Sequence, residues 1–141
     1  MAQQIQDFMT GHPVTARTLT SLSEAARLMR DADIGDLLVV DDDGRLKGIL
    51  TDRDLVIRAI AENRDPAETT VRAVCSPAPV TVQPQDAPGR AADLMHEHAL
   101  RRLPVTEEDG CLVGIVTLGD LAIEGDPDSA LADISTAESN G

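Results

Sequence analysis

Aromatic side chains are almost absent from this sequence: Phe8 is the only Phe, Tyr or Trp among 141 residues. The core must therefore be aliphatic, which suits small layers of helices packed closely on sheets. Cysteine is also scarce, and we expect Cys75 and Cys111 to be free thiols in a reducing cytoplasm. A disulfide between them stays open, but a chain of this length buries roughly 70% of its unfolded surface and can fold without one.

Long apolar runs and basic residues are also scarce. No stretch is long and apolar enough to span a bilayer, and residues 1–9 lack the basic start and apolar run of a signal peptide. The 25 acidic residues outnumber the 12 Lys and Arg residues, for a net charge of −13. Such a surface repels phosphate backbones and anionic membranes, so we expect no binding to nucleic acid or membrane. A few local cations can still hold a nucleotide.

What the chain does contain is an internal repeat, in a register that aligns Pro13 with Pro79. This register holds without a gap from Pro13 to Leu55, which shared composition alone would not produce. The matched positions include Pro13-Val14-Thr15 with Pro79-Val80-Thr81, Leu28-Met29 with Leu94-Met95, Asp43-Gly44 with Asp109-Gly110, Gly48-Ile49 with Gly114-Ile115, and Thr51 and Asp54 with Thr117 and Asp120.

Both halves predict the same order of elements, β-α-β-β-α. In the first half, Ser21 with Glu24 forms a capping box before an apolar helix face. In the second half we expect Asp86 to be the N-cap, with Pro88 tolerated in the first turn. Asp-Gly turns join the two hairpin strands of each half. The expected elements are strands 14–16, 37–40 and 46–50 with a helix from Thr51, and strands 80–82, 103–106 and 112–116 with a helix from Thr117.

The sequence thus predicts an α/β (α+β) fold of two packed repeats. A three-stranded sheet this small cannot bury both faces alone, whereas two copies packed together can. We assign residues 1–64 to repeat 1 with its N-terminal lead-in, 65–70 to a linker and 71–124 to repeat 2. Residues 125–141 form an acidic tail that we expect to be flexible.

The aligned motifs resemble the CBS domain, the repeat named after cystathionine β-synthase. The motifs are Asp7-Phe8-Met9-Thr10, Gly48-Ile49-Leu50-Thr51-Asp52-Arg53-Asp54, Arg102-Leu103-Pro104-Val105 and Gly114-Ile115-Val116-Thr117-Leu118-Gly119-Asp120. The run from Thr51 to Ile57, followed by Asp65-Pro66, is also similar to stand-alone two-CBS proteins of the mycobacterial hypoxic-response type. The resemblance implies a pseudo-two-fold pair of repeats with a cleft on each side. It also implies assembly into homodimers, and AMP, ADP, ATP or S-adenosylmethionine as a regulatory ligand, with no cofactor required.

The duplicated Thr-x-x-Asp motif is the candidate ligand site. Thr51 and Thr117 stand where a strand gives way to a helix, where free backbone N–H groups can hold a phosphate. Asp54 and Asp120 lie one turn along on the same face, and each can accept from two ribose hydroxyls. The alternative interpretation is that the threonines are N-caps and the acids favour the helix dipole, and the sequence leaves the two open.

The resemblance places the adenine against the first strand of each repeat, at Val14-Thr15 and Val80-Thr81, although plain sheet packing explains these residues equally well. It also gives the position of Arg102 a role in holding phosphate, for which a guanidinium is suited. The first repeat has Asp36 at this position. We therefore expect a cleft with Thr51, Asp54 and Arg102 to hold phosphate better than its counterpart, unless Arg102 only makes surface salt bridges.

No constellation of catalytic residues emerges. His96 and His98 are two residues apart on an expected helix and point away from each other, so we expect a solvated helix end and no metal site. Neither cysteine has a histidine beside it in the sequence. We expect a non-catalytic sensor that signals to a separate, unidentified partner protein. The alternative is a ligand-free structural dimer acting in protein–protein interaction or stress response.

Overall fold

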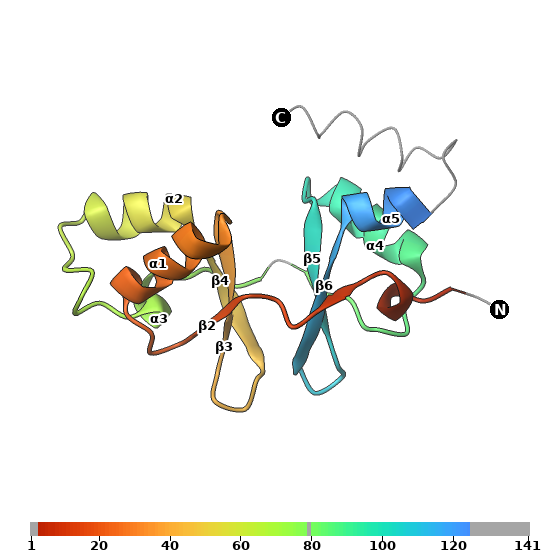
Figure 1. The fold of residues 1–141 in the computed structure, drawn as a ribbon, viewed down its shortest axis with the longest axis horizontal. Coiled ribbons are helices and arrows are strands. Elements are labelled where there is room, and N and C mark those ends of the chain that lie inside the picture. Colours follow the sequence, from red (N-terminus) through yellow and green to blue (C-terminus); the bar gives the residue numbers. More distant parts are fainter. Residues whose placement is uncertain (1–2, 79, 125–141) are drawn as a thin grey trace. The chain divides into compact units, whose positions relative to one another are not determined.

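The computed structural model describes residues 3–78 and 80–124, in two compact units (Figure 1). Within these described residues, unit 1 contains residues 3–12, 80–109 and 113–124, and unit 2 contains residues 13–78 and 110–112. Each unit has its own three-stranded sheet and its own hydrophobic core. The predicted acidic tail lies outside the described residues.

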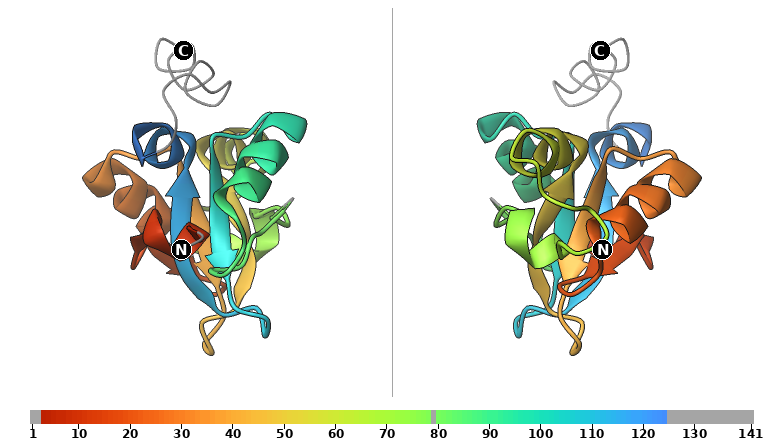
Figure 2. Two further views of the ribbon diagram at one scale, coloured as in Figure 1. Left: turned by 90° about the vertical axis from the view of Figure 1, so that its right-hand side faces the viewer. Right: turned by 90° about the vertical axis from the view of Figure 1, so that its left-hand side faces the viewer.

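Unit 2 is built on a sheet with strand order β2-β3-β4. Strand β2 (Thr15–Arg17) runs parallel to β3 (Asp36–Val40), and β3 is antiparallel to β4 (Leu46–Thr51). The helices are α1 (Leu22–Ala32), α2 (Asp52–Asp54), which continues as the π-helix η2 (Leu55–Ile60), and α3 (Val71–Val74). Helices α1, η2 and α3 and the sheet share one aliphatic core, and α3 packs beside η2 (Figure 2).

Local chemistry sets the boundaries of these elements. Ser21 Oγ accepts a hydrogen bond from Glu24 N at 3.2 Å, so Ser21 is the N-cap of α1, but the return bond from Ser21 N to the Glu24 side chain, which the predicted capping box requires, is not formed. In the hairpin turn, Asp41 Oδ1 accepts from Asp43 N and Arg45 N at 2.9 and 3.0 Å. The bond from Arg45 is the main reason that the pKa of Asp41 is lowered. Gly44 follows with φ of +82°, a conformation that glycine adopts without strain.

Unit 1 has the strand order β1-β6-β5. Its elements are the short helix η1 (Ile5–Asp7), β1 (Thr10–Gly11), α4 (Pro88–Glu97), β5 (Arg102–Thr106), β6 (Leu112–Thr117) and α5 (Leu118–Glu124). Helices α4 and α5 contact each other. The predicted hairpin and both helix positions are therefore present in this repeat as well.

Two predictions for the second repeat are wrong. A strand over 80–82 is replaced by a single bridge, in which Val82 pairs with Val105. Pro104 stands where the first repeat has Leu38, and a proline has no N–H with which to extend the ladder. The N-cap of α4 is Ala87, and Asp86 Oδ2 instead accepts from Gln83 N at 2.8 Å.

The segment that precedes each repeat completes the unit formed by the other repeat. In unit 1, Ile5 is buried in the core, and Thr10 pairs with Ile115 of β6. In unit 2, Val71 and Val74 are buried in the core, and Ser76 exchanges two hydrogen bonds with Ile49, at 2.7 and 2.9 Å. The register of the internal repeat aligns these two segments with each other. Each unit therefore combines residues from both sequence repeats. The predicted ends of the repeats, at residues 64 and 71, stay a prediction.

Candidate functional site

Both Thr-x-x-Asp motifs adopt the same reciprocal geometry at a strand-to-helix junction. Thr51 Oγ1 accepts from Asp54 N at 3.0 Å, and Asp54 Oδ2 accepts from Thr51 N at 3.0 Å. The matching distances for Thr117 and Asp120 are 3.0 and 3.1 Å. All four bonds are part-buried. This is a capping box, so each threonine caps its helix whatever else it does.

The helix N-termini offer fewer donors than the sequence suggested. Asp52 N donates to Gly35 O at 2.9 Å, and Leu118 N donates to Arg101 O at 2.8 Å. The amides of Asp54 and Asp120 are bonded to threonine oxygens. At each motif, two of the first three helix amides are therefore already bonded within the protein.

The two carboxylates have different surroundings. Asp54 Oδ1 lies 3.9 Å from Arg58 Nε, and the Asp54 side chain is 13% exposed against 54% for Arg58. Such a loose, half-exposed ion pair contributes little energy. The second repeat has Glu124 at the position of Arg58. Because this residue is acidic, the second motif has no counterpart of the ion pair between Asp54 and Arg58.

Cys75 lies close to the first motif. Burial raises the pKa of its thiol above the ordinary value of 9.0, and the negative charge of Asp54 raises it further. The thiol is thus mostly protonated near neutral pH, which is the opposite of what a catalytic cysteine needs.

Alkylation of Cys75 by iodoacetamide should report on Asp54. Replacing Asp54 by Asn removes the negative charge, so we expect the midpoint of the pH–rate profile for Cys75 to move to lower pH. Near pH 8 the rate should then rise roughly two- to threefold. Peptide mass spectrometry gives the rates of Cys75 and Cys111 in one sample. Asp120→Asn is the matched control, and an equal acceleration in that variant would refute the electrostatic link.

The remaining predicted residues are distributed over both units. Thr15 lies in β2, while Val14 precedes that strand and is exposed. Val80 packs against the core of unit 1, and Thr81 is exposed. Arg102 begins β5 and is exposed. Its predicted grouping with Thr51 and Asp54 joins residues of different units and stays a prediction.

Asp36, which occupies the position of Arg102 in the first repeat, pairs in register with Thr51. A carboxylate therefore begins the strand beside the first motif, within the same unit.

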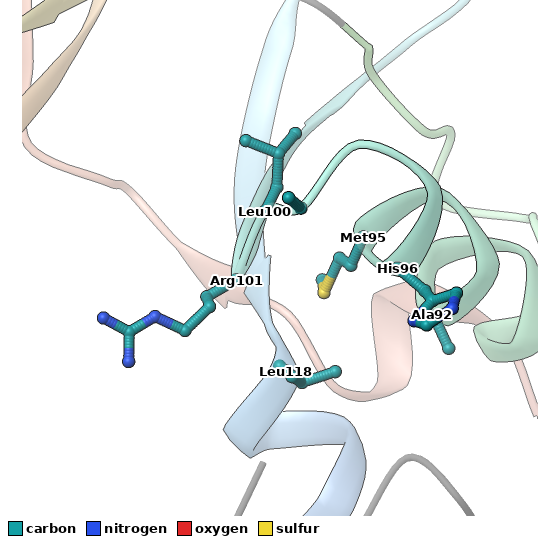
Figure 3. Close-up of a pocket in the computed structure, with 7 residues that line it drawn as sticks. Ala92, Met95, His96, Leu100, Arg101 and Leu118 are labelled. Atoms are coloured by element: carbon teal, nitrogen blue, oxygen red, sulfur yellow. The ribbon is translucent and has the colours of Figure 1, made fainter. Parts of the chain in front are cut away.

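A cavity in unit 1 was not foreseen from the sequence, because its lining comes from separate segments. The cavity measures about 260 Å³ and is lined by Ala92, Met95, His96, Ala99, Leu100, Arg101 and Leu118 (Figure 3). None of the nine predicted ligand-binding residues lines it. Within residues 3–78 and 80–124, no three His, Cys, Asp or Glu side chains are grouped so as to hold a metal ion. No helix in this described part of the chain could cross a membrane.

A model of the CBS domain family matches this chain twice, over residues 5–60 and 71–124. YlbB of Bacillus subtilis is 41% identical over 140 residues, which cover 96% of this chain and 93% of that protein. Hypoxic response protein 1 of Mycobacterium tuberculosis is 41% identical over 102 residues, or 72% of this chain and 71% of that protein.

Solved structures give the same result for the fold. Hypoxic Response Protein I, described with two coordinated zinc ions, has a TM-score of 0.78 at 35% identity, covering 88% of this chain and all of that one (100%). CBSX2 in complex with AMP has a TM-score of 0.75 at 28% identity, with 95% and 99% covered. The CBS domain pair of MJ0100, in complex with 5'-methylthioadenosine and S-adenosyl-L-methionine, has a TM-score of 0.70 at 27% identity, with 87% and 95% covered.

Proposed function

Because this chain belongs to the CBS domain family, we propose that it is a non-catalytic regulatory module that binds an adenine nucleotide or a related adenosyl ligand. Binding would alter how the chain contacts a separate partner protein, which requires that the ligand prefers one conformation over another. The observation that carries this proposal is the pair of geometrically equivalent Thr-x-x-Asp motifs. The adenosyl ligands of CBSX2 and MJ0100 support the choice of ligand class.

The geometry suggests what each group would do. The second oxygen of Asp54 or Asp120 would accept from the ribose hydroxyls, since the first already accepts from the threonine amide. The hydroxyl protons of Thr51 and Thr117 would be donated to the ligand. Val14, Thr15, Val80 and Thr81 would contact the adenine, and Arg102 would contact phosphate.

Isothermal titration with AMP, ADP, ATP and S-adenosylmethionine tests the proposal. We expect at least one of them to bind, and Asp54→Asn or Asp120→Asn to weaken binding roughly 10- to 100-fold at the motif that is used, because a bond to a charged acceptor is lost. Asparagine still accepts from the threonine amide, so the cap is preserved. Asp93→Asn, on the exposed surface of α4, is the matched control.

Comparing Asp54→Asn with Asp120→Asn shows which of the two motifs binds the ligand. An Arg102→Ala variant that binds as well as the parent would refute the predicted role of Arg102. If all four ligands fail to bind, the proposal of an adenosyl sensor is wrong.

The second candidate function is a ligand-free dimer that acts in protein–protein interaction. It is favoured by three aliphatic side chains on η2, because Val56, Ile57 and Ile60 are 55%, 44% and 65% exposed. We propose a homodimer for either function. Light scattering of the full chain, with and without AMP, measures its mass and shows whether the ligand changes it.

A further inference from the structure

Three aliphatic side chains are exposed together on helix η2 of unit 2. Val56, Ile57 and Ile60 are 55%, 44% and 65% exposed. Residues three and four apart on a helix are neighbours, so these three form one apolar stripe, which we call the η2 face. Of the five large hydrophobic side chains that are exposed in the described residues, three therefore lie on this face. Such a patch is typical of a surface that another segment covers.

Two exposed arginines flank the η2 face. Arg53 lies three residues before Val56. Arg64 is held at the other end of the helix, where its N–H donates to Ala59 O at 2.9 Å. Within residues 3–78 and 80–124, neither arginine side chain forms an ion pair or a hydrogen bond. Both charges are therefore available to an acidic group that approaches the stripe.

The acidic residues nearby are directed away from the η2 face. The Asp52 carboxylate lies beside Gly35, on which a Cβ would be 3.2 Å from Asp52 Oδ2. Asp65 Oδ1 accepts a backbone amide at 3.0 Å within its own turn. Glu62 lies on another side of the helix, because residues two apart in sequence do not face each other. The η2 face thus combines an apolar stripe with two exposed cations.

The second repeat has no equivalent face. Continuing the register of the internal repeat places Asp126 at the position of Ile60. It also places Gly119 and Ala130 at the positions of the two arginines. The stripe and its cations are therefore not needed for the fold that the two repeats share.

The sequence beyond Glu124 contains a segment of complementary chemistry. Residues 126–138 include four acidic side chains and no Lys, Arg or His. The segment also has two large aliphatic residues, Leu131 and Ile134, whose spacing lets them share one face of a helix. An apolar stripe recognises amphipathic segments through aliphatic anchors at this spacing.

We propose that residues 126–138 of one copy bind the η2 face of a second copy, and that the reciprocal contact closes a two-fold dimer. Leu131 and Ile134 would cover the stripe, and the acidic side chains would meet Arg53 and Arg64. The two arginines would supply a local attraction between molecules that each have a net charge of −13. This inference rests on the homodimer proposed above and is independent of the adenosyl ligand.

Light scattering of the full chain over a dilution series measures the dissociation constant of the dimer. Leu131→Ser and Ile60→Ser should each raise this constant roughly 10- to 100-fold, because each removes an aliphatic side chain from both equivalent contacts. Leu19→Ser is the matched control and should leave the constant unchanged, since Leu19 is 71% exposed but lies outside the η2 face.

The contribution of charge is tested in the same way. Arg53→Gln should weaken the dimer roughly two- to tenfold, because one exposed ion pair is lost from each of the two contacts. Arg27→Gln makes the same change in net charge on α1, outside the η2 face, and should have no effect.

A single tryptophan locates the segment. The chain has no Trp or Tyr, so Leu131→Trp introduces a fluorophore without background. Its emission should shift to shorter wavelength as the dimer forms, and adding Ile60→Ser should return it to that of a solvated indole. Thermal unfolding of each variant shows that it is folded.

Two results would overturn the proposal. An unchanged dissociation constant in Leu131→Ser would mean that another segment holds the two copies together. An emission shift that persists on dilution to the monomer would mean that the segment binds within its own molecule. A monomeric parent would contradict this proposal together with the homodimer, whereas tail-dependent dimers that bind no adenosyl ligand would contradict only the sensor function.

Discussion

A fragment of residues 13–64 is expected to unfold at a clearly lower temperature than a fragment of residues 13–78, or to show no cooperative transition at all. The longer fragment contains Val71 and Val74, which are fully buried in the core of unit 2, and Ser76, which pairs with Ile49. Burying one valine contributes roughly 1.5–3 kcal/mol. Two of them contribute roughly 3–6 kcal/mol, which is comparable to the lower end of the stability of a small domain, about 5–15 kcal/mol.

Circular dichroism at 222 nm during heating measures this difference. Residues 1–64 serve as a control, because they restore the N-terminal segment but not residues 71–76. The structure assigns that segment to unit 1, so this fragment should unfold as residues 13–64 do. If 13–64 and 13–78 melt at the same temperature, residues 71–76 do not complete unit 2.

Gly48→Ala and Gly114→Ala are each expected to destabilise the protein by about 1–3 kcal/mol, because both glycines lie against a crossing backbone. A Cβ on Gly48 would lie 2.5 Å from Ser76 O, and one on Gly114 would lie 2.8 Å from Thr10 O. Neither carbonyl can move without breaking the strand pairing that it belongs to. The expected result is a lower midpoint of urea unfolding with little change in its slope.

Gly89→Ala is the matched control, because a Cβ there meets nothing within 4 Å. Gly89 lies in α4, where alanine is the better helix former by up to about 1 kcal/mol, so this variant should be unchanged or more stable. Equal destabilisation in all three variants would show that close contact with the crossing segments is not the cause.

The sequence predicted only part of the candidate site. Thr51 with Asp54 and Thr117 with Asp120 are brought together as predicted, because the helix itself sets their spacing. The hydrogen bonds from Asp52 N to Gly35 O and from Leu118 N to Arg101 O could not be anticipated. These two bonds depend on where one strand begins relative to the end of the next, and no short sequence pattern predicts this alignment.

The fold likewise has features that the sequence predicted and features that it did not. The hairpins and most helix starts were predictable, since Asp-Gly turns and a serine cap act within a few residues. The missing strand at 80–82 was not, because it depends on Pro104, a residue of the strand it would have joined.

The internal repeat that aligns Pro13 with Pro79 was decided by the sequence alone, and with it the family, the β-α-β-β-α order and the duplicated motifs. Only the tertiary structure decided which segment completes which unit. Residues 5–11 and 71–76 each pack on the sheet of the other repeat, and a short apolar segment contains no information about which of two similar sheets it will join. The cavity of unit 1 was decided in the same way, since residues at 92–101 and 118 form one surface only after packing.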